Sequence, residues 1–166
     1  SVSYNKNASG TQTKETTGDK WYGYVRDKAG NTYSTNITVK KDTVDPVCTV
    51  TPSGTIGTNS WYTSNVTFTL AKSDATSDIA KYGIIASTTT TYNSQTSQTL
   101  SSDKDSITYY GYVKDNAGNT KSCSSTVKRD ATPPTCSVNA SGTVGDNSWY
   151  TSDVSISITP DDNLSD

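Results

Sequence analysis

The chain has 166 residues, a net charge of −2 at neutral pH and no histidine, and Ser and Thr together fill 55 positions. Hydrophobic residues make up only 30% of it, with no Met and one Phe, so any core is thin and calls for a covalent staple. The near-neutral charge, with scattered Lys and Arg, excludes a basic nucleic-acid-binding face, and no apolar run reaches the ~20 residues of a membrane-spanning helix.

The sequence repeats itself with a period of 88 residues. NSWYTS at 59–64 returns letter for letter at 147–152, and 43–78 aligned with 131–166 gives 17 identities in 36 positions without a gap. One complete unit therefore spans 43–130, after the C-terminal half of a unit at 1–42 and before the N-terminal half of another at 131–166. The period exceeds the ~20–47 residues of helical solenoid repeats and suits a β-sandwich module.

Short stretches in which apolar and hydroxyl side chains alternate predict an all-β unit. In chain order we expect strands near 47–51, 65–70, 79–86, 95–100, 107–114 and 120–128. In the last of these, Cys123, Ser125 and Val127 share the face that we expect to point inward. There is no helical periodicity of useful length.

The sequence DNAGN at 115–119 predicts a compact hairpin turn between the last two strands. Asp115 can open such a turn with a side-chain hydrogen bond to the backbone, and Gly118 or Asn119 can adopt positive φ. The same pattern, DKAGN, stands one period earlier at 27–31.

Three cysteines are present, and the repeat predicts how they pair. Cys136 lies one period after Cys48, and the position matching Cys123 in the first half-unit is Thr35, so only Cys48 and Cys123 belong to the same complete unit. We predict a disulfide between these two, with Cys136 unpaired; the alternative is a pair of buried free thiols in a cytosolic protein. The bond would close a loop of about 76 residues, worth roughly 4.5 kcal/mol in the chain-entropy model, and would indicate an extracellular location.

The segments between units are short and contain proline: KDTVDP at 41–46 and RDATPP at 129–134. Proline restricts the backbone, so successive units are expected to be stiffly coupled into a rod. Two explanations stay open for the half-units. They are parts of a longer chain, or half-domains of neighbouring copies complete each other by strand donation in a filament. Neighbouring repeats or copies of the same protein are the expected partners.

The stretch YGYVKDNAGN at 110–119, followed by a strand and the boundary at 130–134, resembles the bacterial Ig-like repeats of surface proteins from Gram-positive bacteria and their phages. The resemblance covers the whole chain, and its turn motif is specific for these modules but not for a ligand. It implies tandem, extracellular Ig-like β-sandwiches that act as a stalk, spacer or adhesin and carry no catalytic residues. The cysteine pair departs from the usual cysteine-free pattern and indicates a demand for stability.

These features favour a structural role, as a cell-surface stalk or spacer or as a filament-forming segment, over catalysis. The sequence has no nucleophile elbow or phosphate loop, so it predicts no catalytic residue and no enzyme. The alternative is an adhesin or phage tail-fibre segment whose repeats bind a host glycan or protein. A binding module should expose a repeated aromatic or polar cluster, whereas a spacer should bury its aromatic residues.

Acidic residues gather in predicted loops, which makes calcium a possible ligand although no cofactor is otherwise expected. The candidates are Asp74, Asp78, Asp161, Asp162 and Asp166, and Asp42 and Asp45 form a further acidic stretch. Ca²⁺ takes 6–8 oxygen ligands. Because the spacing differs between copies, the alternative is that these side chains are solvated and cap their own turns. A cysteine-bound metal is not expected, since the chain has no CxxC pair and no histidine.

The tryptophans Trp61 and Trp149 are predicted to be the aromatic anchors of their cores, with an aromatic sugar-binding platform as the alternative. We expect Gly111 to leave room for Trp61, because a glycine inside a strand often faces a bulky neighbour. Five N-x-Ser/Thr sequons, expected by chance in so Ser/Thr-rich a chain, begin at Asn7, Asn36, Asn65, Asn139 and Asn163.

Overall fold

The computed structural model describes residues 9–165 and is all-β. Within these residues the only helical elements are two 3-10 turns, η1 at Thr58–Ser60 and η2 at Asp146–Ser148, and no helix is long and apolar enough to cross a membrane. The strands are β1 (Thr16–Arg26), β2 (Thr32–Lys41), β3 (Val47–Ser53), β4 (Trp61–Tyr62), β5 (Val66–Ser73), β6 (Ile79–Ile85), β7 (Ser97–Leu100), β8 (Lys104–Asp115), β9 (Thr120–Arg129), β10 (Thr135–Ser141) and β11 (Ser155–Asp161).

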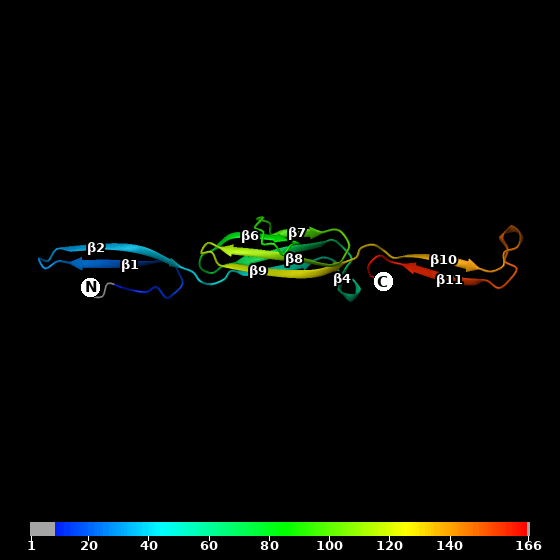
Figure 1. Ribbon diagram of the computed structural model, residues 1–166, viewed down its shortest axis with the longest axis horizontal. Helices are drawn as coiled ribbons and strands as arrows, with labels where there is room; N and C mark the ends of the chain where they lie inside the picture. Colours follow the sequence, from blue (N-terminus) through cyan, green and yellow to red (C-terminus); the bar gives the residue numbers. More distant parts are fainter. Residues whose placement is uncertain (1–8, 166) are drawn as a thin grey trace.

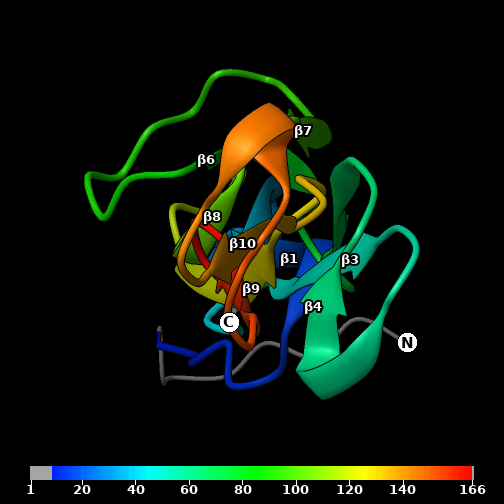
Figure 2. The same cartoon turned by 90° about the vertical axis from the view of Figure 1, so that its right-hand side faces the viewer.

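The strands form three bodies in a row: a β1–β2 hairpin, a central body made of β3 to β9, and a β10–β11 hairpin (Figure 1). The strands run roughly along the long axis of the row. The chain therefore enters the central body at the end next to the first hairpin and leaves it at the opposite end. Figure 2 looks along this axis, with the three bodies one behind another.

The central body contains two sheets, ordered β3-β5-β7 and β4-β9-β8-β6. All neighbouring strands are antiparallel except β4, which pairs parallel to β9. Side chains from both sheets meet in one core, an arrangement consistent with a β-sandwich. The six strands expected from the sequence are all present, whereas β4 is an addition.

The core is built by the period-two alternation of the strands. On β5, Val66, Phe68 and Leu70 are 0–3% exposed while the Thr residues between them are more open. Phe68 stacks on Tyr109 of the opposite sheet, with ring centroids 4.2 Å apart. Val127 of β9 is buried too, which confirms the inward face predicted for that strand.

The flanking hairpins match parts of the central body at a distance of one period. Subtracting 88 from the bounds of β8 and β9 reproduces β1 and β2 to within one residue, and adding 88 to those of β3 and β5 gives β10 and β11 with the same agreement. The matching faces of β11 and β5 differ in how far they are exposed to solvent. Ile156 and Ile158 are 63% and 68% exposed, whereas Phe68 and Leu70 at the matching positions are 0% and 3% exposed.

The repeated NSWYTS sequence forms the same turn in both places. Asn59 has a φ of 50° and its counterpart Asn147 one of 53°, a left-handed conformation that asparagine adopts more readily than most residues. The N–H of Gly57 donates to the carbonyl of Trp61 at 2.8 Å, and the matching pair one period later does so at 2.7 Å. The turn is thus fixed by its local sequence, because it forms both beside the two-sheet body and on the isolated hairpin.

The predicted contact between Gly111 and Trp61 is wrong. A Cβ at Gly111 would lie 2.6 Å from Cδ1 of Leu70, 2.9 Å from Sγ of Cys123 and 3.0 Å from Cγ2 of Val50. Glycine therefore makes room between the sheets for the cysteine pair and its aliphatic neighbours. The pattern of the strand indicated a close approach but could not say which residue approaches.

Candidate functional site

A disulfide joins the first and last strands of the central body. Cys48 near the start of β3 is bonded to Cys123 on β9, with their Cα atoms 5.8 Å apart, which confirms the predicted pair. Because β3 and β9 belong to different sheets, the bond also ties the two layers together. Cys136, one period after Cys48, is a free and exposed thiol.

The turn between β8 and β9 has the predicted form. Oδ1 of Asp115 accepts hydrogen bonds from the N–H groups of Gly118 at 2.6 Å and Asn119 at 2.8 Å. Gly118 has a φ of +109°, a value that residues with a side chain rarely adopt. The matching turn on the first hairpin is opened in the same way by Asp27, whose Oδ1 accepts from the N–H of Asn31 at 2.8 Å.

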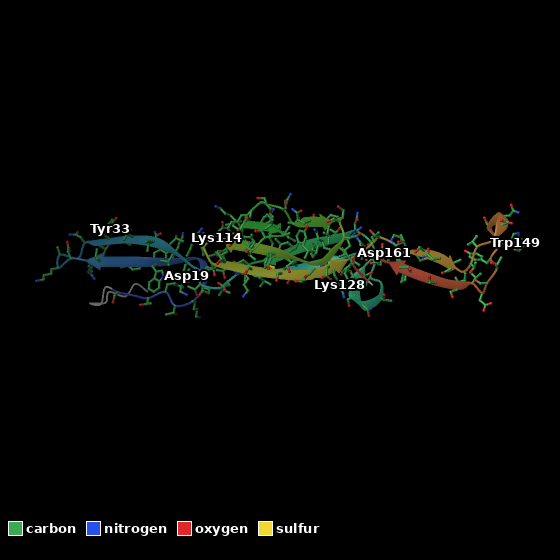
Figure 3. All side chains as sticks on the ribbon, turned by 45° about the vertical axis from the view of Figure 1, so that its right-hand side comes forward. Asp19, Tyr33, Lys114, Lys128, Trp149 and Asp161 are labelled. Atoms are coloured by element: carbon green, nitrogen blue, oxygen red, sulfur yellow. A yellow bond between two sulfur atoms is a disulfide. The ribbon has the colours of Figure 1, made fainter. Side chains whose placement is uncertain are left out.

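The β8–β9 turn also fastens two other segments at its end of the central body. The side-chain amide of Asn116 donates to the carbonyl of Ser77 at 2.6 Å, and the backbone N–H of Asn116 donates to the carbonyl of Asp78 at 3.0 Å. The amide of Asn119 donates to the carbonyl of Val44 at 3.2 Å. The linker, the β5–β6 loop and the turn therefore meet at this end, which Lys114 marks in Figure 3.

Three carboxylates come together where these segments meet. Asp42 directly follows β2, Asp74 opens the β5–β6 loop and Asp115 ends β8. Each of the three offers a carboxylate oxygen within 4.8 Å of those of the other two. Asp115 is 1% exposed and the other two are half-buried. Of the five calcium candidates proposed from the sequence, Asp74 belongs to this cluster, together with Asp42 from the further acidic stretch.

The remaining acidic candidates lie elsewhere. Asp78 is exposed in the same loop, and Asp161, followed by Asp162, ends β11 near the opposite end of the central body (Figure 3). Asp166 falls outside the described residues. Asp74 and Asp162 cap their own loops, as the alternative interpretation expected. Hydrogen bonds, chiefly from the N–H of Ser77, hold the pKa of Asp74 below its usual value, so it is charged at neutral pH.

A charged clamp fixes each linker to the strand pair before it. At the first linker, Glu15 accepts hydrogen bonds from Nζ of Lys41 at 2.7 Å and from the N–H of Thr43 at 2.9 Å. These bonds, led by that of Lys41, lower the pKa of Glu15. The clamp holds the last residue of β2 and the second residue after it against the segment that precedes β1.

The same clamp recurs one period later, with the shorter Asp103 in place of Glu15 and the longer Arg129 in place of Lys41. Asp103 pairs with Arg129, which is 7% exposed, and accepts from the N–H of Ala131 at 3.0 Å. The hydroxyl of Thr132, followed by that N–H, lowers the pKa of Asp103. The sequence interpretation missed this clamp, although an acid and a base repeated 88 residues apart were a signal that could have revealed it.

The tryptophans do not anchor the core. Trp61 is half-buried beneath the ammonium group of Lys128, 4.8 Å from the ring centroid, while the adjacent Tyr62 is 8% exposed and belongs to the core. Adjacent residues of a strand point to opposite faces, so only one of this pair can face inward. Trp149 is 72% exposed at the tip of the last hairpin (Figure 3).

The sequons are accessible where the structure describes them. Asn7 lies outside the described residues, and the exposed positions are Asn36, Asn65, Asn139 and Asn163. The side chain of Asn65 accepts a hydrogen bond from Arg129 at 3.2 Å, so it also takes part in the second clamp.

Comparison with known proteins does not assign the chain to a family. No protein-family model matches the chain, and no curated protein matches it. The arguments for function therefore rest on the disulfide, the repeated elements and the linker clamps.

Proposed function

We propose that this chain is a segment of an extracellular bacterial stalk built from tandem Ig-like domains, and that its role is mechanical. The observation that carries the proposal is the disulfide between the strand that enters the central body and the strand that leaves it. Tension along the row enters at β3 and leaves at β9 (Figure 1). The bond joins these strands directly, so that the load bypasses the residues between the two cysteines.

The recurrence of elements at 88 residues supports a tandem organisation. The matching hairpins, turns and clamps keep the same relations on both sides of the central body. The apolar faces of β1–β2 and β10–β11 match faces that are buried in the central body, so each hairpin presents half of a similar core. If the chain instead forms a filament by strand donation, strands of a neighbouring copy would pack against these same faces.

The linkers support a stiff rod over a flexible string of domains. Each clamp holds the exit strand and the first linker residues by several hydrogen bonds to one carboxylate. Proline follows within a few residues in both linkers, which restricts the backbone further. Rotation about the junctions is thereby limited.

The alternative, an adhesin or phage tail-fibre segment whose repeats bind a host glycan or protein, has less support. All eight aromatic residues of 43–130 are buried or half-buried, so the complete unit offers no open aromatic platform. The exposed aromatic side chains belong to the flanking hairpins, on which Trp149 and Tyr33 are labelled in Figure 3. A spacer is expected to bury its aromatic residues in this way.

Small-angle scattering of arrays with one, two, three and four copies of 43–130 tests the rod. A stiff stalk predicts a maximum dimension that grows in proportion to the number of copies, because each junction keeps its direction. As a matched control, Asp103→Ala removes the clamp at every junction and should make the growth sublinear. Sublinear growth in the unmodified array would contradict the proposal, and binding of the array to host glycans would favour the adhesin.

A further inference from the structure

The two flanking hairpins expose apolar faces, and the central body shows what kind of face covers each of them. The exposed side chains are Val138, Ile156 and Ile158 on β10–β11, and Trp21 and Val25 on β1–β2. At a distance of one period, the first group matches core residues of the β3-β5-β7 sheet and the second matches core residues of the β4-β9-β8-β6 sheet. These two sheets bury each other's inner faces in the central body, so the face of each hairpin is suited to cover that of the other.

The two hairpins lie at opposite ends of the row, where Tyr33 and Trp149 mark them in Figure 3. They therefore cannot meet within one chain, and the contact needs a second copy. The two faces are different surfaces, so the last hairpin of one copy meets the first hairpin of the next. Such a heterologous contact between the ends of a row repeats without closing and produces a linear filament.

The sizes of the facing side chains compensate for each other at the centre of this contact. In the central body, Phe68 stacks on Tyr109 with ring centroids 4.2 Å apart. The matching positions hold Ile156, which is smaller than Phe, and Trp21, which is larger than Tyr. Exchanges that conserve the total volume are the ones that a packed core tolerates best. The two hairpins thus differ from the central body in opposite directions, as expected if they pack on each other.

The space beside Gly23 is open on the first hairpin. At Gly111, one period later, a Cβ would lie 2.6 Å from Cδ1 of Leu70, because that side chain reaches across from the opposite sheet. At Gly23 the corresponding Cβ would meet only Cγ2 of Thr35, at 3.7 Å. The counterpart of Leu70 is Ile158, an exposed side chain of the same composition. Ile158 of a second copy can therefore occupy the space beside Gly23.

A contact between a lysine and a tryptophan in the central body also has matching residues on the two hairpins. Lys128 lies over the ring of Trp61, 4.8 Å from its centroid, where β4 pairs with β9. The matching residues are Lys40 on the first hairpin and Trp149 at the tip of the last, and both are exposed. A cation over an indole ring is favourable, so docking would cover Trp149 with the same kind of partner.

The charges are complementary at the neighbouring position. Nη2 of Arg129 donates to Oδ1 of Asn65 at 3.2 Å in the central body. The matching residues are Lys41, at the end of β2, and Asp153, shortly before β11. A neutral acceptor is thus replaced by a carboxylate opposite a base, which favours this pairing of hairpins through electrostatic complementarity.

We propose that the β10–β11 hairpin of one copy docks on the β1–β2 hairpin of a second copy, in the register in which the two sheets of the central body pack. Copies of the chain then join head to tail. The positions that would match β6 lie outside residues 1–166, so this contact buries less than the central core and the association is reversible. The docking rests on the two faces alone, whereas its use to lengthen a stalk rests on the proposed function.

A new cysteine at position 35 tests the docking and its register. Thr35 is the counterpart of Cys123 and Cys136 is that of Cys48, and the bond between Cys48 and Cys123 joins Cα atoms 5.8 Å apart. In Thr35→Cys, mild oxidation should therefore link position 35 of one copy to Cys136 of the next and give a ladder of oligomers on a non-reducing gel. Mass spectrometry of the linked peptides identifies the bond. Sedimentation of the unmodified chain should show oligomers that grow with concentration.

Ser34→Cys is the matched control, because Ser34 is equally exposed but lies next to Thr35 and so on the opposite face of β2. It should form about ten times less of the bond to Cys136. Adding Ile158→Asp, a replacement outside the central body, should remove the ladder of Thr35→Cys.

Equal cross-linking at positions 34 and 35, a ladder that survives Ile158→Asp, or an unmodified chain that stays monomeric at all concentrations would overturn the proposal. So would bonds formed mainly between like positions of two copies. Scattering of the 43–130 arrays tests the stiff stalk separately, since these arrays contain neither hairpin on its own.

Discussion

Replacing Cys48 and Cys123 together with Ala should lower the free energy of unfolding of the central body by about 4 kcal/mol. The bond links residues 75 apart in the sequence, and closing such a loop in the unfolded chain is worth roughly 4.5 kcal/mol. Single domains are stable by only about 5–15 kcal/mol, and the core here is thin, so most of the stability should be lost. Urea unfolding followed by tyrosine and tryptophan fluorescence measures the change.

Cys136→Ala is the matched control, since Cys136 occupies the same repeat position as Cys48 but is free and exposed. It should change the free energy of unfolding by less than about 0.5 kcal/mol. Adding a reductant to the unmodified chain should reproduce the effect of the double replacement. A double variant as stable as the unmodified chain would show that the bond contributes nothing to folding.

Gly111→Val is the second replacement with a large expected effect. Its Cβ would lie 2.6 Å from Cδ1 of Leu70 and 2.9 Å from Sγ of Cys123, closer than real side chains approach each other. The sheets must separate to admit the branched side chain, which disturbs the packing around the disulfide. Overpacking typically costs about 1–3 kcal/mol, and we expect the upper end or more here, measured by urea unfolding.

Gly23→Val provides the comparison, because Gly23 lies one period before Gly111 on the first hairpin. A Cβ there would meet only Cγ2 of Thr35, at an ordinary contact distance of 3.7 Å. This replacement should be nearly neutral, since valine favours strands. Equal destabilisation by the two replacements would refute the role assigned to Gly111.

The strands and the disulfide of the central body could be predicted because their signals are local or repeated. Alternating side chains reveal the inward face of β5, and the 88-residue period assigns Cys48 to Cys123 without knowledge of the fold. The turn at 115–119 could be predicted for the same reason: the side chain of Asp115 can accept hydrogen bonds from the turn backbone, and Gly118 can adopt a positive φ. Each of these features depends on few residues close in sequence or on comparison between copies.

The carboxylate cluster could not be predicted in full because its members are far apart in the sequence. Asp42 and Asp74 stood out as loop residues, but Asp115 appeared only as the first residue of its turn. Knowing that the three lie together requires the order of strands in both sheets. The short β4 was missed for a similar reason: two residues carry no periodicity, and the parallel pairing of Trp61 with β9 is a tertiary contact.

Pulling the single chain by its two ends, with and without a reductant, tests the central claim most directly. The unfolded, oxidised central body should reach an end-to-end length of only about 50 Å, because the 12 residues of the 88-residue unit outside the disulfide loop extend by about 3.4 Å each and the bond spans 5.8 Å between its Cα atoms. After reduction the same unit should extend to about 300 Å. An oxidised unit that extends to about 300 Å would contradict the proposal that the Cys48–Cys123 bond carries the load.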